Sequence, residues 1–469
     1  MAVIKTPRRC PVQKIKKLPI GIQTFANLIE EGYLYVDKTP FIHKLTDQGK
    51  YYFLSRPRRF GKSLFLSTLK AAFEGRKELF QGLFLYDNWD WSQSNPVVHI
   101  SFGSGVARSV EELQETCDEI LYDHSRAFGI EYHKVSRKGR FAELIQTLYE
   151  QTGRRVVVLV DEYDKPILDS IENTEMAIAL RDELKNFYSV IKDADPYIEF
   201  VFITGVSKFS KVSLFSGLNN LKDITIDKRF SDICGYTQDE LESVFSGWID
   251  DNTDLVEVKS WYNGYSWMGR QVYNPFDILL YLDSKVFQNF WFETGTPAFL
   301  VKLLRKGRYY IPEIQNMVAG EEIVGSFDVD NITVEALLFQ TGYLTITGFE
   351  QIGAFQRYQL SYPNLEVRAG LTNAILNGLV QDHLAKTRNQ SHVLDSLSNN
   401  DFPALKKTMQ AFFSSIPHDW YRKNKLASYE GYYASIVYCY FAALGLDVRV
   451  EDATNHGRID RAHSHFPGQ

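Results

Sequence analysis

Four short apolar runs that alternate with helical patterns constrain the fold of this chain more than any other feature. The runs span residues 51–54, 96–102, 156–160 and 197–204. The helical patterns between them span residues 64–73, 110–122, 141–152 and 175–191. Continuous apolar runs are typical of strands buried on both faces, and strands that alternate with helices form parallel sheets. The sequence therefore predicts an α/β fold with three layers around a largely parallel sheet.

The loop S-R-P-R-R-F-G-K-S at residues 55–63 joins the first run to its helix. In a phosphate-binding loop, backbone N–H groups surround the phosphates, a Lys reaches the β- and γ-phosphates, and a Ser or Thr hydroxyl ligates Mg²⁺. Gly61, Lys62 and Ser63 occupy those last three positions, but Arg56 stands where the standard pattern has a Gly. The tripeptide alone is a weak signal, and a solvated helix start explains it equally well. The residues expected around ATP are Pro57, Arg58, Arg59, Phe60, Gly61, Lys62, Ser63 and Leu64.

The third apolar run ends in two carboxylates, in the segment V-V-V-L-V-D-E. An acidic residue at the exit of a buried strand can hold magnesium, and the next one can activate the attacking water. We therefore predict that Asp161 and Ser63 bind the metal and that Glu162 and Lys62 are catalytic. In the alternative reading, the two acids only cap the turn or helix at residues 165–167. The order of loop, strand and acidic pair favours the nucleotide site.

The fourth run ends in F-I-T-G-V-S-K and places two hydroxyls, those of Thr204 and Ser207, at a strand end. Thr204 is the better candidate for sensing the γ-phosphate or positioning water, and we include it among the catalytic residues. A hydroxyl that bonds its local backbone is an equally good explanation. Arg229 is a candidate for an arginine finger supplied to a neighbouring subunit. An isolated Arg is usually exposed or ion-paired, so we leave Arg229 out of the catalytic residues.

The pattern changes beyond residue 235, where a helical stretch (237–248) precedes an aromatic segment (261–276) with Asn and Gly. We expect three regions: a P-loop domain (1–235), a helical or winged-helix-like lid (236–365), and a helical segment with a C-terminal module (366–469). Short helices are expected at 276–282, 297–304 and 334–341. A strand is expected at 33–36, and a Ser- and Asn-rich linker at 394–400.

Five motifs in this order resemble the bacterial AAA-ATPase-like family: L-P-I-G-I-Q-T-F, Y-L-Y-V-D-K-T, R-P-R-R-F-G-K-S, L-V-D-E-Y-D-K-P-I and Y-N-G-Y-S-W…Y-N-P-F. The resemblance runs from about Leu18 to Tyr343. In that family the arginine-rich loop is the usual form, so Arg56 is no departure. The resemblance implies an ATPase domain that uses ATP and Mg²⁺, with a glutamate after the metal-binding aspartate. Two or three arginines then add positive charge near the phosphates.

The C-terminal end resembles the beginning of a PD-(D/E)xK nuclease domain, in E-G-Y-Y-A-S, G-L-D-V-R-V-E and T-N-H-G-R-I-D. Glu430 and Asp460 match the helix Glu and the first strand Asp of that family. The strand with E-x-K should follow, but residues 461–469 contain neither Glu nor Lys. We therefore expect an incomplete, inactive nuclease-like end. The histidines of this tail (His456, His463 and His465) are expected in a frayed terminus rather than a metal site.

Composition limits the functional classes. The formal charge of −6 argues against a dedicated nucleic-acid binder. A DNA or protein partner is therefore suggested only by analogy with related proteins. The sequence is also compatible with a homo-oligomer. Four scattered cysteines without a C-x-x-C pair indicate neither disulfides nor zinc, and favour a reducing, cytoplasmic setting. No apolar stretch approaches the roughly 20 residues that span a bilayer, so no membrane insertion is expected.

These observations favour an ATP hydrolase that couples its nucleotide state to the lid and the C-terminal module. The alternative is a nucleotide-regulated binding or scaffold protein with negligible turnover. A kinase-like phosphoryl transferase is less favoured, because the sequence shows no motif for binding an acceptor.

Overall fold

The computed structural model describes residues 15–215, 218, 220–293, 300, 304, 310–325, 328, 333–378, 383–415, 430–448, 452–454 and 457–459. Asp460, residues 461–469 and the histidine at 456 lie outside this part of the chain, and so does the side chain of Glu430.

A five-stranded sheet forms the centre of the N-terminal half. Its strands are β1 (Tyr51–Ser55), β2 (Val97–Ser101), β3 (Val156–Asp161), β4 (Ile198–Gly205) and β5 (Lys222–Asp223). They lie in the order β2-β3-β4-β1-β5, and every neighbouring pair is parallel. The predicted parallel sheet is confirmed. The carboxyl ends of β1, β3 and β4 lie side by side, so the loops that follow them share one edge of the sheet.

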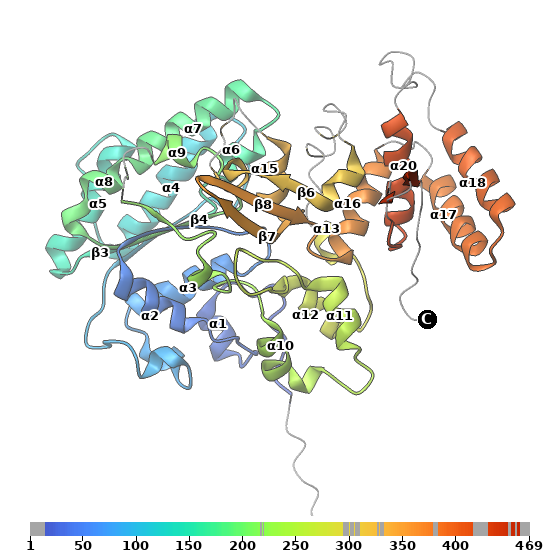
Figure 1. Cartoon of the computed structure of the whole chain (residues 1–469). Coiled ribbons are helices and arrows are strands. Elements are labelled where there is room, and N and C mark those ends of the chain that lie inside the picture. Colours follow the sequence, from blue (N-terminus) through green and yellow to red (C-terminus); the bar gives the residue numbers. More distant parts are fainter. Residues whose placement is uncertain are drawn as a thin grey trace, which may run out of the picture.

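Helices cover both faces of this sheet (Figure 1), so the three-layer prediction is confirmed. One face carries α3 (Lys62–Phe73) with α1 (Phe25–Glu30) and α2 (Thr39–Gln48). The other face carries α4 (Val110–Phe128), α5 (Arg137–Thr152) and α7 (Thr174–Tyr188). Serine caps start two of these helices, because Ser109 accepts a hydrogen bond from Glu112 N and Ser136 one from Gly139 N. The four predicted strands match β1 to β4 within about one residue at each end.

The chain beyond residue 235 forms short helices and a second, antiparallel sheet. The helices are α10 (Gln238–Val244), α11 (Leu255–Tyr262), α12 (Pro275–Ser284), α13 (Phe290–Glu293) and α15 (Val334–Gln340). The sheet contains β6 (Met317–Ala319), β7 (Thr345–Ile352) and β8 (Phe355–Ser361) in the order β6-β8-β7. The helices expected at 276–282 and 334–341 are present, whereas the range 297–304 falls mostly outside the described residues. The second sheet was not predicted.

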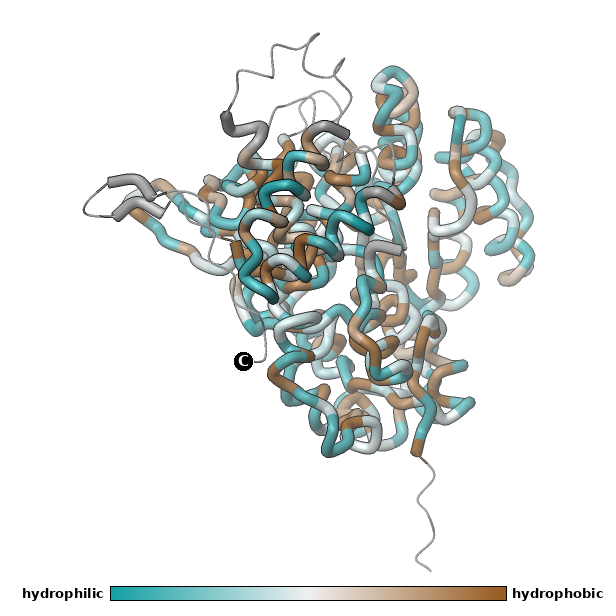
Figure 2. Tube along the Cα trace, turned by 90° about the vertical axis from the view of Figure 1, so that its right-hand side faces the viewer, coloured by the Kyte–Doolittle hydropathy of each residue, from teal (hydrophilic) through white to brown (hydrophobic). Residues whose placement is uncertain are grey.

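Further helices follow this sheet: α16 (Leu365–Asn377), α17 (His383–Ser398), α18 (Phe402–Ser415) and α20 (Glu430–Ala442). The strands β9 (Asp452–Thr454) and β10 (Gly457–Ile459) form an antiparallel pair after them. Figure 2 looks onto the C-terminal helices, along which hydrophobic and hydrophilic residues alternate. None of the helices among the described residues is both long enough and apolar enough to cross a bilayer.

Two local predictions were wrong. The expected linker at 394–400 mostly continues α17, because Val393 is fully buried and Leu397 packs against the core on the same helix. Among the described residues, the expected strand at 33–36 forms only a single bridge, between Tyr33 and Lys17. Its apolar Val36 is buried in a small cluster with helices from beyond residue 235.

Candidate nucleotide-binding site

The loop after β1 opens on a cavity of about 520 Å³ at the start of α3. Gly61 precedes the helix with φ +88°, a left-handed conformation that glycine adopts without strain. The cavity is lined continuously from Arg58 to Phe65. A helix start with free backbone N–H groups attracts anions, so this end of the cavity suits phosphates.

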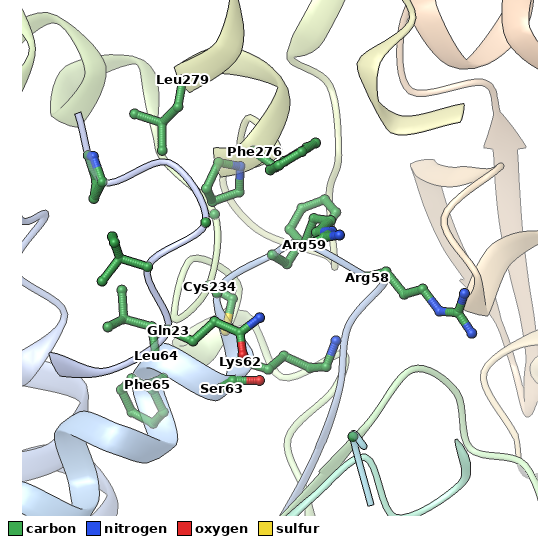
Figure 3. A pocket seen from close by; sticks show the side chains of 18 of the residues that line it. Gln23, Arg58, Arg59, Lys62, Ser63, Leu64, Phe65, Cys234, Phe276 and Leu279 are labelled. Atoms are coloured by element: carbon green, nitrogen blue, oxygen red, sulfur yellow. The ribbon is translucent and has the colours of Figure 1, made fainter. Parts of the chain in front are cut away.

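Lys62 is the first residue of α3, and its side chain is buried in the loop. Its Nζ donates hydrogen bonds to the carbonyl oxygens of Arg56 and Pro57, at 2.9 Å each. Burial lowers the pKa of Lys62, and the nearby Asp161 acts in the opposite direction. Figure 3 shows Lys62 and Ser63 beside each other in the pocket. An anion at the start of α3 would compete with these two carbonyls for the ammonium group.

Asp161 and Thr204 close the carboxyl ends of β3 and β4. Both are buried, and among the described residues neither Asp161 Oδ1 nor Thr204 Oγ1 has a hydrogen-bond partner. A buried polar atom without a partner is costly unless a ligand supplies one. The described residues contain no group of three or more His, Cys, Asp or Glu side chains that would hold a metal alone. A hydroxyl such as that of Ser63 and a carboxylate such as that of Asp161 are suitable ligands for Mg²⁺, which typically takes one or two carboxylates together with phosphates and water.

Glu162 turns its side chain into the cavity, which it lines. Its backbone has φ +53°, a left-handed conformation that is uncommon for a residue with a side chain and is often found at functional sites. Burial raises the pKa of the Glu162 carboxyl, and the charge of Asp161 raises it further. The two successive acids thus have different surroundings, one buried at the strand end and one at the cavity wall.

Asp164 was not predicted as part of the site, yet it fixes the geometry of this edge. It is fully buried and accepts hydrogen bonds from Val206 N at 3.2 Å and from Ser207 N and Oγ at 2.8 Å. The Tyr163 hydroxyl donates to the carbonyl oxygens of Ser207 and Phe209. Ser207 therefore has a structural role, whereas Thr204 keeps a free hydroxyl among the described residues. Helix α6 (Lys165–Asp169) has no side-chain cap, which disfavours capping as the role of the acidic pair.

Gly205 lies directly against Asp164, and its replacement tests this contact. A Cβ at Gly205 would lie 2.5 Å from Asp164 Oδ1 and 2.6 Å from the Tyr163 ring. We expect Gly205→Ala to lower the free energy of unfolding by about 1–3 kcal/mol, the usual cost of overpacking. Urea denaturation measures this loss. Gly247→Ala is the matched control, since its Cβ would meet nothing closer than 3.5 Å. Equal stability of the two variants would contradict the assigned contact.

The arginines of the loop do not all line the cavity. Arg56 is fully buried, lies 4.1 Å from the Trp267 ring centroid and donates to the carbonyl oxygens of Thr225 and Phe230. Burial lowers its pKa to about 10. Arg58 and Arg59 line the cavity (Figure 3), so the expectation of added positive charge applies to these two.

Two residues of the predicted site, Phe60 and Pro57, have settings that the sequence motif did not indicate. The Phe60 ring is buried between the rings of Tyr265 and Trp267, at centroid distances of 4.8 and 5.3 Å, so only its backbone suits a ligand. Pro57 does not line the cavity and lies against Gly342. Arg229 is exposed and paired with Asp227, as expected for an arginine outside the site.

The far end of the cavity is mainly apolar. Its wall includes Ile22, Val36 and Tyr236, and Phe276 and Leu279 of α12 lie opposite the start of α3 (Figure 3). The side-chain amide of Gln23 also lines this cavity. A phosphate-binding end and an apolar end in one cavity suit a nucleotide.

Comparisons with known proteins agree with this geometry. A family model described as predicted AAA-ATPase matches residues 19–215. A model of the PD-(D/E)XK nuclease superfamily matches residues 428–465. The chain is 53% identical over 446 residues to an uncharacterized protein in the vnfD 5' region of Azotobacter chroococcum mcd 1, which covers 95% of this chain and 86% of that protein. No solved structure matches.

Proposed function

The chain belongs to the AAA-ATPase-like family, and from that premise we propose that it binds ATP with Mg²⁺ and hydrolyses the γ-phosphate. The proposal rests mainly on the pair of acids at the end of β3. Asp161 presents a buried oxygen without a partner among the described residues, and Glu162 turns into the cavity beside the P-loop. A metal ligand followed by a general base is the arrangement that phosphoryl transfer to water requires.

Each residue then has a defined task. The backbone N–H groups from Gly61 to Leu64 and the ammonium of Lys62 bind the phosphates. Ser63 and Asp161 hold Mg²⁺, which when bound neutralises charge on the phosphate oxygens. Glu162 accepts the proton of the water that attacks the γ-phosphate, and its raised pKa brings it closer to the ideal for a base near neutral pH. Thr204 orients that water or the γ-phosphate.

The apolar end of the cavity is assigned to the base of the nucleotide. We expect Leu279→Trp to fill this end and to lower the affinity for ATP on the order of 10- to 100-fold, because the contacts to the base are lost. Affinity for inorganic tripolyphosphate should stay unchanged, since the phosphate end is untouched. Calorimetry with both ligands measures the two effects. Leu280→Trp, one position further on the same helix, is the control; unchanged ATP affinity in Leu279→Trp would contradict the assignment.

A nucleotide-regulated scaffold with negligible turnover is the second candidate. It is supported by the Lys62 ammonium, which is held by two carbonyls of its own loop and has to be released by the ligand. Binding alone could then switch the protein between two states. Such a protein would bind ATP through the same cavity but would not need Glu162.

The test is Mg²⁺-dependent release of phosphate from ATP by the purified full chain, with and without duplex DNA. Turnover above the level of the Lys62→Ala variant supports the ATPase, and binding without turnover supports the scaffold. Stimulation by DNA would support a DNA partner for the region that resembles PD-(D/E)XK nucleases. We further propose action in the cytoplasm and coupling of the nucleotide state to that C-terminal region.

A further inference from the structure

The P-loop is held by residues from beyond position 235. Trp267 stacks on Arg56 and contacts Phe60, Tyr265 also contacts Phe60, and Gly342 lies against Pro57. The Arg59 guanidinium lies 4.8 Å from the ring centroid of Phe276, at the start of α12. We call these contacts the loop clamp. The loop is therefore in direct contact with the region after residue 235.

Behind the clamp, two acidic side chains face each other in the interior. Asp277 of α12 and Glu366 of α16 are both fully buried, and the carboxyl group of each acts on the pKa of the other. Glu366 Oε1 accepts a hydrogen bond from Trp291 N at 2.9 Å. Among the described residues, no hydrogen-bond partner reaches Glu366 Oε2 or either oxygen of Asp277. Two adjacent carboxyl groups in such a place cannot both be ionised, so they share a proton.

The charged and titratable groups around this acid pair come from every neighbouring element. Arg59 of the loop is the cation that acts on Asp277. Tyr262 of α11 and the nearby Tyr265 present phenol groups, whose pKa values burial raises. From α13, the backbone N–H groups of Phe290 and Trp291 act on Glu366. With one shared proton, the pair carries a single negative charge, and the positive charge of Arg59 lowers the pKa of Asp277, which favours its ionised form.

We propose that the Asp277–Glu366 pair is a positioning element that holds Arg59 and takes up a proton when a nucleotide occupies the P-loop. This proposal rests on the proposed function, because it requires a phosphate ligand in the cavity that Arg59 lines. A bound phosphate attracts Arg59 and also brings negative charge toward the pair. Both effects favour the doubly protonated, neutral pair, and the second proton comes from the buffer.

The acid pair titrates in a pH range in which this proton uptake can be measured. Burial raises the pKa of Glu366 to about 7, while the Trp291 N–H acts in the opposite direction. Burial, followed by the charge of Glu366, raises the pKa of Asp277 well above its usual range. Helix α13 contacts both α12, which lines the cavity, and α16.

The closing experiment is calorimetric titration of the full chain with MgADP at pH 7, in two buffers that differ in ionisation enthalpy. ADP avoids turnover, and the difference in heat gives the number of protons bound. We expect an uptake of up to about one proton per nucleotide in the wild type. The double variant Asp277→Asn/Glu366→Gln keeps the shape of the pair and should lose this uptake. The control is Asp239→Asn. Asp239 is an exposed carboxylate of α10 that pairs with Arg270, so this variant should keep the proton uptake.

Thermal unfolding without nucleotide shows whether the double variant is folded and tests the protonation of the pair independently of binding. The pKa of Glu366 is higher in the folded than in the unfolded chain, so its contribution to stability is complete below about pH 4.5 and is lost as the pH rises through about 7. The melting temperature of the wild type should therefore fall more steeply between pH 5 and 8 than that of the double variant. An equally steep fall would contradict the assigned protonation.

The outcomes separate the two proposals. Wild-type protein that binds no nucleotide would refute the proposed function and the linkage with it. Binding without proton uptake would refute the linkage alone. Uptake that persists unchanged in the double variant would assign the proton to another group, such as the buried Lys62, and would also overturn the proposal.

Discussion

Lys62→Ala is expected to abolish tight ATP binding, with a loss of affinity of roughly 10- to 100-fold, since a hydrogen bond to a charged group contributes about 1.5–3 kcal/mol. The Lys62 ammonium is the buried cation at the start of α3, and alanine cannot reach the β- and γ-phosphates from that position. Equilibrium binding of a fluorescent ATP analogue, with Mg²⁺ present, measures the loss. The fold should survive, because alanine is a good helix former and Lys62 donates only to two loop carbonyls.

The matched control is Lys50→Ala. Lys50 precedes the opposite end of β1 and forms a partly exposed ion pair with Asp195 at 2.9 Å. Removal of this surface pair should change the stability by less than about 1 kcal/mol and should leave ATP binding unchanged. If Lys62→Ala binds ATP as tightly as Lys50→Ala does, the loop does not bind phosphate and the central assignment is wrong.

Glu162→Gln is expected to keep ATP binding and to reduce turnover by about 10²- to 10⁴-fold, the usual contribution of a general base. The amide has nearly the same size as the carboxyl group, so the cavity wall is preserved while the proton acceptor is lost. The pH dependence should have a defined sign in the wild type. Because burial raises the pKa of Glu162, turnover should fall as the pH drops through that raised pKa, where the base becomes protonated.

Steady-state and single-turnover rates at several pH values measure both effects. Glu199→Gln serves as the control, because Glu199 is the exposed residue of β4 and lies 4.0 Å from Arg155, away from the cavity. Equal turnover in Glu162→Gln and Glu199→Gln would remove Glu162 from its role. Wild-type binding without measurable turnover would instead favour the scaffold function.

Local patterns were sufficient to predict four of the five strands of the sheet and the ends of those four, whereas the short edge strand β5 was not predicted. Each of the four predicted strands is a short apolar run, and its neighbours along the chain are helices, so spacing and polarity identify it without tertiary information. The position of the P-loop between β1 and α3 followed from the same reasoning. The acidic pair at the end of β3 was also visible, because carboxylates directly after a buried strand are unusual.

Contacts between distant segments could not be predicted in this way. The burial of Arg56 depends on Trp267 and on carbonyls near Thr225 and Phe230, and no local pattern indicates a stacked, buried arginine. The bond between Asp164 and the backbone after β4 likewise requires the two strand ends to be placed side by side. The Asp277–Glu366 pair joins two helices whose sequences each look ordinary. Such features arise from the packing of the whole chain.

The loop clamp has a consequence for how this protein can be divided. The family match ends at residue 215, but Phe60 is buried against Tyr265 and Trp267, and Arg56 is covered by the same tryptophan. A fragment that stops near residue 235 would expose a phenylalanine and a desolvated arginine in the loop at residues 55–63. The two regions are therefore expected to be inherited together, since recombination at this boundary would separate this loop from the aromatic side chains that pack against it.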